Sequence, residues 1–334
     1  MRALVTGGTG FVGSPLVSRL LQDSWQVSLI TRDRRRVLQQ GNDRLEVFDA
    51  DVSDQGAISS IAQGCGRPDV VFHLAASLSY FDRKSVYRTN VIGTRNLLDL
   101  AVRTSAGKFI YASSIEAIGA VKRSEVPAPA DSPTRPISPY GASKVAAEKL
   151  VAEAARRGLP AAILRIGSVY GPGHLNCITD IAEAILTRNR LLEFLPVYAD
   201  RYIHPIYNRD VTEGLMAACR TDLPMATVVL GGEYATVGHI FEVCCQILGR
   251  PLAGRPKRKW DQAYLMLRRE YHRRTNGMDL ITYLMAPSGR RVHRAYSTDK
   301  TFQILDLADQ VPLRTGIAET LAWVRNEKVF KLDR

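Results

Sequence analysis

Two side chains near the middle of the chain have the types and spacing needed for proton transfer. Tyr140 and Lys144 lie four residues apart, where the pattern of residues 142–155 predicts a helix. Residues four apart share one helix face, so the Lys144 ammonium can lie beside the Tyr140 phenol. A neighbouring cation favours the phenolate and lowers the tyrosine pKa from its usual value of about 10. Tyr140 is therefore a candidate general acid and base, although an aromatic ring packed under a lysine stem is the alternative.

A glycine-rich stretch at the N-terminus has the pattern of a phosphate-binding turn. Glycines at positions 7, 10 and 13 follow a predicted strand, residues 2–6, and precede an amphipathic segment, residues 15–21. Such a turn lets bare backbone approach a diphosphate, which the N–H groups of the helix N-terminus then bind. The sequence therefore predicts a nucleotide site, with a plain glycine-rich turn as the alternative.

Strand-like and helix-like segments alternate through the first half of the chain. The predicted strands are residues 2–6, 26–31, 45–49, 69–74, 108–113 and 161–166. This alternation is typical of an α/β fold with a doubly wound parallel sheet and helices on both faces. Because ligands of such sheets bind at the carboxyl ends of the strands, we expect the chemistry at that edge.

The alternation fades after residues 171–173, which read Gly-Pro-Gly. Residues 126–139 contain five prolines and are predicted as an irregular loop. We expect further helices at 178–186, 237–248 and 316–326 and a strand at 227–230. These elements predict a smaller, mostly helical C-terminal substrate lobe. The predicted dinucleotide-binding domain comprises residues 1–171 and 208–235, and the predicted lobe comprises residues 172–207 and 236–334.

Composition narrows the class of protein. The chain has 334 residues, 46% of them hydrophobic, and no apolar run approaches the ~20 residues of a membrane helix. A predicted strand at the N-terminus leaves no room for a signal peptide, so cytoplasmic residence is expected. The five cysteines have no spacing typical of metal ligands or a disulfide framework, so neither a metal site nor disulfides are expected.

The net charge of +12 is uneven along the chain. Residues 251–300 hold 12 Lys and Arg against 4 Asp and Glu, which is two thirds of the surplus. Nucleic acid is not an expected partner, because no nucleic-acid-binding motif accompanies this segment. An anionic small substrate, a partner surface or a membrane face suits the charge better, with a solvated basic face as the alternative.

The basic segment also has an apolar helical face formed by Trp260, Tyr264 and Leu267. This face predicts either a helix that covers the core or a lid over a bulky hydrophobic or acyl substrate. The arginines that could bind an anionic group of such a substrate are Arg268, Arg269, Arg273 and Arg274.

Six ordered stretches resemble one enzyme superfamily. They are TGGTGFVG at 6–13, DVVFHLAA at 69–76, NVIGTRNLLDLA at 90–101, YASSIEAIG at 111–119, YGASKVAAEKL at 140–150 and LRIGSVYGPG at 164–173. The chain thus resembles the extended short-chain dehydrogenase/reductases, which include NAD(P)-dependent epimerases, dehydratases and steroid dehydrogenases. The resemblance implies a Rossmann-type sheet, a nicotinamide cofactor and a small carbonyl or alcohol substrate. A homodimer is an open alternative to a monomer.

The resemblance also implies residue roles. Tyr140 would be the catalytic acid and base, and Lys144 would lower its pKa and hydrogen-bond the nicotinamide ribose. Ser114 would polarise the substrate oxygen, with Ser113 as the fallback. Asn90 would support the cofactor site. The other implied cofactor-binding residues are Gly7, Gly10, Phe11, Val12, Gly13, Asp51, Val52, Leu74, Ala75 and Ala76.

The tip of the second predicted strand bears on the choice of cofactor. An NAD-specific site commonly has an acid there for the ribose hydroxyls, whereas this chain has Thr31 followed by Arg32. A guanidinium suits a 2′-phosphate, so NADP(H) is favoured. Asp33 keeps NAD(H) as an alternative, because a small backbone shift could bring it to the ribose.

Departures from the resemblance bear on the reaction. Sugar-nucleotide dehydratases have an Asp-Glu pair where this chain has Ile115 and Glu116, so dehydration is not expected. Ser168 replaces the asparagine that commonly contacts the substrate diphosphate, whereas Arg201 lies in a segment close to one that meets a nucleotide phosphate in epimerases.

Three functions remain from these observations. The first is an NADP(H)-preferring oxidoreductase that interconverts a ketone and a secondary alcohol. The second is a redox-neutral sugar-nucleotide epimerase with tightly bound NAD. The third, a redox-sensing binding protein, is disfavoured because a sensor needs no acid or base.

Overall fold

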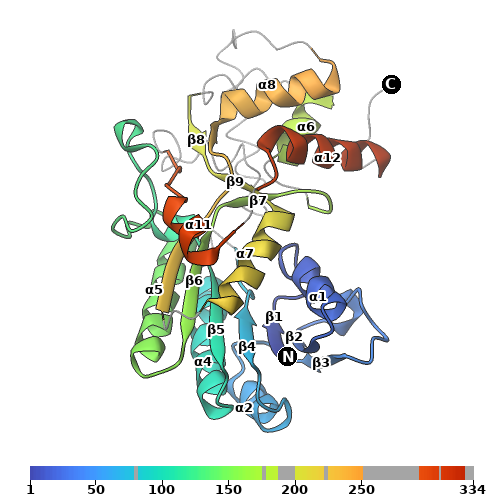
Figure 1. Cartoon of the computed structure of the whole chain (residues 1–334), viewed down its shortest axis with the longest axis vertical. Coiled ribbons are helices and arrows are strands. Elements are labelled where there is room, and N and C mark those ends of the chain that lie inside the picture. Colours follow the sequence, from blue (N-terminus) through green and yellow to red (C-terminus); the bar gives the residue numbers. More distant parts are fainter. Residues whose placement is uncertain are drawn as a thin grey trace.

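The computed structural model describes residues 1–78, 82–174, 178–186, 200–221, 225–250, 293–307 and 310–327. Its centre is a seven-stranded parallel sheet with the order β10-β6-β5-β4-β1-β2-β3 (Figure 1). The strands are β1 (Arg2–Thr6), β2 (Gln26–Thr31), β3 (Leu45–Asp49), β4 (Val70–His73), β5 (Lys108–Ser114), β6 (Ala161–Ile166) and β10 (Met225–Leu230). The order in which strands are added changes side between β1 and β4: β2 and β3 follow on one side of β1, and β4, β5 and β6 follow on the other. The carboxyl ends of β1 and β4 therefore border the crevice where such sheets bind ligands.

Helices cover both faces of this sheet because its strands are apolar on both sides. One face packs against α1 (Gly13–Gln22), α7 (Asn208–Arg220) and α11 (Asp299–Leu305), and the other against α2 (Gln55–Gly64), α4 (Gly93–Arg103) and α5 (Pro139–Arg156). Successive strand residues point to opposite faces, so Val5 lies in the first core and Leu4 in the second. The predicted α/β fold with a doubly wound parallel sheet is confirmed.

A separate core lies beyond the carboxyl edge of the sheet, in the upper part of Figure 1. It is formed mainly by α6 (Ile178–Leu186), α8 (Val237–Leu248) and α12 (Leu313–Asn326). Short strands β7 (Ser168–Tyr170) and β9 (Pro205–Tyr207) pair in parallel, and β8 (Tyr202–Ile203) pairs antiparallel with β11 (Ala235–Thr236). The division into two domains at the expected boundaries stays a prediction.

Short helical segments complete the described chain. They are α3 (Arg83–Tyr87), a π-helical turn at Arg88–Ile92, and 3₁₀ turns at Arg34–Arg36, Ile115–Ala117 and Arg123–Glu125. Residues 126–138 form no helix or strand, as the prolines there predict. The apolar face at 260–267 and the neighbouring arginines at 268–274 lie outside the described residues.

Residues 293–297, here named the strap, cross the loop that follows β5. His293 and Val121 exchange two backbone hydrogen bonds of 3.0 and 3.2 Å. The Ala128 N–H donates to the Ala295 carbonyl at 3.0 Å, and the Ser297 N–H donates to the Ala128 carbonyl at 2.8 Å. The Arg294 N–H donates to the Tyr202 carbonyl at 2.9 Å, which ties the strap to β8. The strap therefore fixes late residues of the chain against the loop beside the end of β5.

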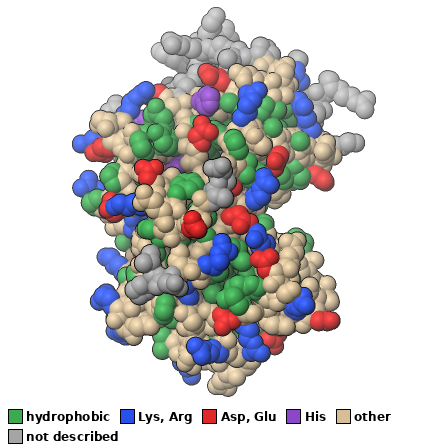
Figure 2. Space-filling model, viewed as in Figure 1, with side chains coloured by type: hydrophobic (Ala, Val, Ile, Leu, Met, Phe, Trp, Pro, Cys, Tyr) green, Lys and Arg blue, Asp and Glu red, His purple; other side chains and the backbone are tan. Residues whose placement is uncertain are grey.

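The surface carries both signs of charge. On the face shown in Figure 2, Lys and Arg side chains are interspersed with Asp and Glu, with no single basic expanse. Within the described ranges, no helix is long and apolar enough to cross a membrane.

Candidate active site

A cavity of about 550 Å³ lies at the carboxyl edge of the sheet. It extends from the glycine turn and the end of β2, past the end of β4, to the ends of β5 and β6. Tyr140, Lys144 and Ser114 line it together with most of the expected cofactor residues, namely Gly7, Gly10, Phe11, Val12, Gly13, Thr31, Arg32, Asp51, Val52, Leu74, Ala75 and Ala76. The fold thus brings the two sequence-predicted centres, phosphate turn and acid/base pair, into one cavity.

The glycine turn packs closely against neighbouring backbone only because its glycines have no side chains. Gly7 has φ of +73°, and a Cβ there would lie 2.7 Å from the Ala75 nitrogen. A Cβ on Gly13 would lie 2.2 Å from the Gly7 carbonyl oxygen, closer than any real contact. The Gly10 N–H donates to the Gly7 carbonyl at 3.0 Å, which closes the turn ahead of α1. This cradle at a helix N-terminus fits the diphosphate of a nicotinamide dinucleotide.

The tip of β2 presents cations to the opposite end of the cavity. Arg32 and Arg36 both line it, with exposed side chains. Asp33 instead pairs with Arg35, Nε to Oδ1 at 2.9 Å, and is not a lining residue. Asp51, which does line the cavity, accepts hydrogen bonds from the Ser53 N–H and hydroxyl at 2.8 and 2.7 Å.

Helix α5 positions Tyr140 and Lys144. The Ser138 hydroxyl accepts a hydrogen bond from the Gly141 N–H at 3.0 Å, which caps the helix, and Pro139 occupies its first turn. A Cβ on Gly141 would lie 2.4 Å from the Glu116 carbonyl oxygen, so glycine lets α5 approach the turn after β5. Tyr140 and Lys144 are consequently buried on the face toward β5.

Burial dominates the electrostatics of this pair. The Lys144 ammonium donates to the Ala112 carbonyl at 2.7 Å and lies 5.7 Å from the Tyr140 ring centroid. Burial lowers the pKa of Lys144 to about 7, partly offset by the Glu148 carboxylate. Burial also raises the pKa of Tyr140 well above its usual value, opposed by a hydrogen bond with Ser114 and reinforced by Glu116. The expected lowering of the Tyr140 pKa by Lys144 is therefore wrong, because the removal of both groups from water outweighs their proximity.

Adjacent serines at the end of β5 have different surroundings. Ser114 lines the cavity, hydrogen-bonds the Tyr140 side chain and accepts from the Glu116 N–H at 3.2 Å. Ser113 is buried and donates to the Glu148 carboxylate at 2.5 Å. Both serines line the cavity, but Ser114 is the one that hydrogen-bonds Tyr140, whereas the Ser113 hydroxyl is engaged by the Glu148 carboxylate.

Asn90 and His73 are uncharged polar residues near β4 that hydrogen-bond the elements around the cavity. Asn90 is buried, exchanges hydrogen bonds of 2.7 and 3.0 Å with the Ser77 backbone, and donates to the Ser143 hydroxyl at 2.9 Å. Asn90 does not line the cavity, and its hydrogen bonds instead connect the loop after β4 to α5. His73 is fully buried between the Thr6 and Thr94 hydroxyls at 2.7 and 3.0 Å, and burial lowers its pKa to about 3.

An ion pair that the sequence did not reveal lies at the Tyr140 end of the cavity. Arg294 of the strap meets Glu116, Nε to Oε1 at 2.6 Å, with both side chains less than a tenth exposed. Both residues line the cavity, as does the expected Ser168. The expected anion ligand Arg201 is buried but does not line it. Nothing in the sequence links Glu116 and Arg294, since they lie 178 positions apart.

Two other lining residues, Arg36 and His174, were also missed. Arg36 lies in the run of arginines after β2, and the 3₁₀ turn at Arg34–Arg36 brings it to the cavity while Arg34 and Arg35 do not line it. The sequence alone does not distinguish these arginines. His174 follows the Gly-Pro-Gly stretch at 171–173, which could have directed attention to it.

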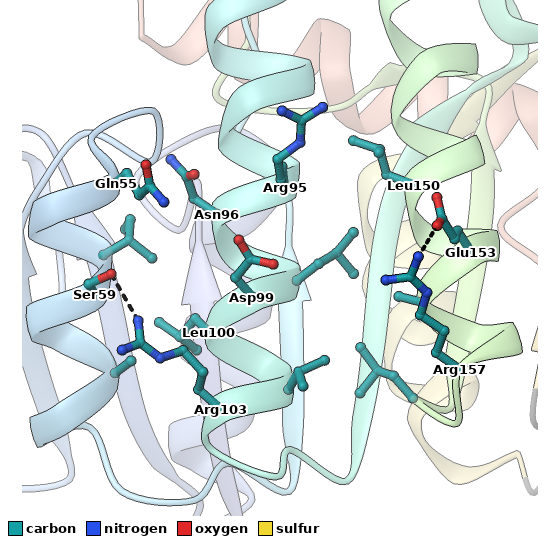
Figure 3. Close-up of a pocket in the computed structure, with 16 residues that line it drawn as sticks. Gln55, Ser59, Arg95, Asn96, Asp99, Leu100, Arg103, Leu150, Glu153 and Arg157 are labelled. Carbon is teal, nitrogen blue, oxygen red and sulfur yellow. Dashed lines mark hydrogen bonds and ion pairs between the residues drawn. The ribbon is translucent and has the colours of Figure 1, made fainter.

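A second cavity of about 600 Å³ lies on the outer side of α2, α4 and α5 (Figure 3). Arg103 there donates to the Ser59 hydroxyl at 3.0 Å, and Arg157 pairs with Glu153. It contains none of the expected site residues, so the chemistry belongs to the smaller cavity. Among the residues that the structure describes, no group of three or more His, Cys, Asp or Glu could hold a metal ion.

Known proteins resemble this chain in both sequence and fold. The NAD dependent epimerase/dehydratase family matches residues 3–225. A Synechocystis protein named "Putative dihydroflavonol 4-reductase" is 34% identical over 240 residues, 70% of this chain and 67% of that protein. The dTDP-glucose 4,6-dehydratase of Escherichia coli is 28% identical over 363 residues, 98% of this chain and 94% of that enzyme.

Solved structures extend the fold match to nearly the whole chain. The UDP-glucose 4-epimerase of Thermotoga maritima with UDP-glucose has a TM-score of 0.74 and 23% identity, covering 98% of this chain and 100% of that one. At this identity the likeness shows the fold. The family match over two thirds of the sequence places the chain in the NAD-dependent epimerase/dehydratase family, as an enzyme with a nicotinamide dinucleotide cofactor.

Proposed function

We propose that the protein catalyses hydride transfer between a nicotinamide cofactor and a substrate carbon bearing a hydroxyl or keto oxygen. The observation that carries this proposal is the cavity that joins the glycine turn to Tyr140, Lys144 and Ser114. A bound nicotinamide would supply or accept the hydride. Ser114 and Tyr140 supply a hydroxyl donor and an adjacent acid/base that are joined by a hydrogen bond in this cavity.

The chain's own residues would handle the substrate oxygen. Ser114 would donate a hydrogen bond to it, and Tyr140 would give or take its proton. The raised pKa of Tyr140 keeps the phenol protonated at neutral pH, the form that donates to a ketone oxygen. Lys144, held on the Ala112 carbonyl beside the phenol, would stabilise the phenolate that remains after this donation.

The first substrate class to test is a sugar nucleotide. The dehydratase and the epimerase that match almost the whole chain both have names that specify nucleotide sugars. Ile115 occupies the position of a dehydratase acid and cannot donate a proton, so a redox-neutral epimerase is favoured over a dehydratase. Such an enzyme would keep its NAD bound between turnovers.

A second candidate, an NADP(H)-dependent ketone reductase, is favoured by the tip of β2. Arg32 and Arg36 line the cavity, and Asp33 is engaged by Arg35 rather than turned toward a ribose. Two guanidinium groups at this end of the cavity suit a 2′-phosphate, although the Asp51 carboxylate also lines it. The similarity to the Synechocystis protein is consistent with this candidate.

Cofactor analysis of the purified protein separates the two candidates. We would denature the protein and quantify the released nucleotides by chromatography. Stoichiometric NAD, with interconversion of UDP-glucose or dTDP-glucose epimers followed by NMR, would support the epimerase. An empty site that binds NADPH and oxidises it with ketones would support the reductase.

Tyr140→Phe tests the chemistry that both candidates share. Loss of the proton donor should reduce turnover at least ~100-fold while cofactor affinity stays nearly unchanged. Tyr87→Phe, at a half-exposed tyrosine outside the cavity, is the matched control and should behave as wild type. Near-normal turnover of Tyr140→Phe would contradict the proposed acid/base.

A further inference from the structure

The glycine turn meets an imidazole from the far side of the cavity. The ring of His174 packs on the ring of Phe11 with centroids 4.4 Å apart and planes inclined by 36°. Phe11 belongs to the turn before α1, whereas His174 follows β7 at the side of the α6, α8 and α12 core. Both residues line the cavity. His174 therefore contacts a residue of the turn that is predicted to bind the diphosphate.

The contact is fixed from several directions. The Asn208 side-chain amide donates to the Phe11 carbonyl at 3.1 Å, which ties the turn to the start of α7. A Cβ on Gly171 would lie 3.7 Å from the tip of the Phe11 ring, so the ring fills the space beside that glycine. Gly173, with φ of +92°, then turns the chain so that His174 faces back toward Phe11. His174 is thus placed by the fold rather than by a flexible tail.

The imidazole has hydrogen-bonding capacity to offer. Within the described part of the chain, neither ring nitrogen of His174 takes part in a hydrogen bond, and the side chain is half-buried at the cavity. A neutral imidazole has one N–H donor and a protonated one has two. Because Phe11 and His174 both line the cavity, a ligand bound beside the glycine turn can reach the edge of the imidazole, where its two nitrogens lie.

We propose that His174 is a binding residue for the diphosphate of the nicotinamide cofactor, opposite the backbone N–H groups of the glycine turn. The proposal rests on the proposed function, because it requires a dinucleotide in this cavity. The Phe11 ring orients the imidazole, and the imidazole donates to a diphosphate oxygen. The ligand is thereby held between the sheet and the segment after β7.

Binding measurements on two variants test the assignment without any substrate. His174→Phe keeps a ring to pack on Phe11 but removes the donor, and His174→Gln restores a donor without the ring. The probes are NADPH, ADP-ribose and adenosine 2′-phosphate, of which only the last has no diphosphate. Dissociation constants would be measured by calorimetry, with His239→Phe, at an exposed histidine of α8, as the control.

We expect His174→Phe to weaken NADPH and ADP-ribose about tenfold or more, the loss expected for one charge-assisted hydrogen bond. Adenosine 2′-phosphate should bind as it does to the wild type, and His174→Gln should recover part of the loss. Unchanged affinity for all probes, or an equal loss for adenosine 2′-phosphate, would overturn the assignment. A loss confined to UDP, measured in parallel, would overturn it in favour of a substrate diphosphate. Failure of the wild type to bind any dinucleotide would instead contradict the proposed function.

Discussion

The preference between NADPH and NADH should depend on the charged side chains at the tip of β2. Arg32 and Arg36 face the cavity, Arg34 pairs with Asp49 at 3.2 Å outside it, and Asp33 is held by Arg35. A guanidinium recognises a phosphate by charge-assisted hydrogen bonds but gains little from a neutral ribose hydroxyl. The two cavity-facing arginines should therefore affect NADPH and NADH unequally.

Arg32→Ala should weaken NADPH by roughly 1.5–3 kcal/mol, or more than tenfold, and NADH much less. Arg36→Ala should act in the same direction. Arg34→Ala, which removes a neighbouring arginine that does not line the cavity, is the matched control. Dissociation constants from nicotinamide fluorescence would check this, and equal losses for NADPH and NADH would show that Arg32 does not read a 2′-phosphate.

Lys144 makes the stability of the fold depend on pH. Its pKa is about 7 when folded, against about 10.4 in an unfolded chain, so the unfolded chain binds more protons between these values. Stability therefore rises with pH across this window, and the penalty for burying the ammonium is complete below pH 7. Lys144→Met should be more stable than wild type at pH 6 by on the order of a few kcal/mol, less the lost hydrogen bond to Ala112.

The gain should shrink as pH rises from 7 and should be absent near pH 10, where unfolded Lys144 also loses its proton. Urea unfolding at several pH values would check this, with Lys149→Met at an exposed position of the same helix as the control. A gain that does not vary with pH would mean that the ammonium is not desolvated in the fold.

The residue types of the acid/base pair were predictable, but their electrostatics were not. Spacing alone places Tyr140 and Lys144 on one helix face, and the structure bears this out. The direction of the Tyr140 shift depends on how much water the surrounding elements exclude, which is a property of packing. The spacing of Tyr140 and Lys144 predicts that a cation lies near the phenol, but it does not predict how far burial removes the two groups from water.

At the scale of elements, three of them are joined by one buried ionic network. Glu148 of α5 accepts from Arg165 of β6 at 2.8 and 3.1 Å, and from Ser113 of β5. The Glu148 and Arg165 side chains are only 8% and 10% exposed, so each charge depends on the other for compensation. This network lies one helical turn after Lys144 and holds α5 on the strands that it must face.

Arg165→Met should reduce the free energy of unfolding by about 3–5 kcal/mol, because it leaves a buried carboxylate without its cation. Adding Glu148→Gln should recover part of that loss, since the remaining charge is removed. Arg157→Met breaks the exposed pair with Glu153 on the same helix and should change stability by less than about 1 kcal/mol. Denaturant titrations would measure all three, and a small effect of Arg165→Met would indicate that water reaches the network.

The elements themselves followed closely from sequence periodicity. Strands β1, β2, β3 and β6 have the expected bounds, as do α6 and α8, because apolar runs between turn residues define them locally. Helix α12 begins three residues earlier than expected, and α5 begins at Pro139, since its Ser138 cap precedes the apolar pattern. The pairing of β7 with β9 and the crossing of the strap over residues 121–128 were not predictable, because both depend on contacts far apart in sequence.

At the scale of the whole molecule, the topology explains why the site could be located but not completed from sequence. A parallel sheet collects its strand ends at one edge, so the glycine turn, Ser114 and Tyr140 were expected to meet there. The far wall comes from His174 and Arg294, which the chain delivers only after leaving the sheet. Their positions follow from the packing of the second core and the strap, for which local patterns give no distances.

The wide separation of Glu116 and Arg294 in the sequence also affects the order in which the site is completed during translation. A ribosome adds on the order of 5–20 residues per second, so Arg294 is synthesised roughly 10–40 s after Glu116. All seven strands of the sheet have been synthesised before Arg294 appears, and with them the glycine turn. Among the described residues that line the cavity, Arg294 is the last to be synthesised, so the Tyr140 end of the cavity is the last to be completed during translation.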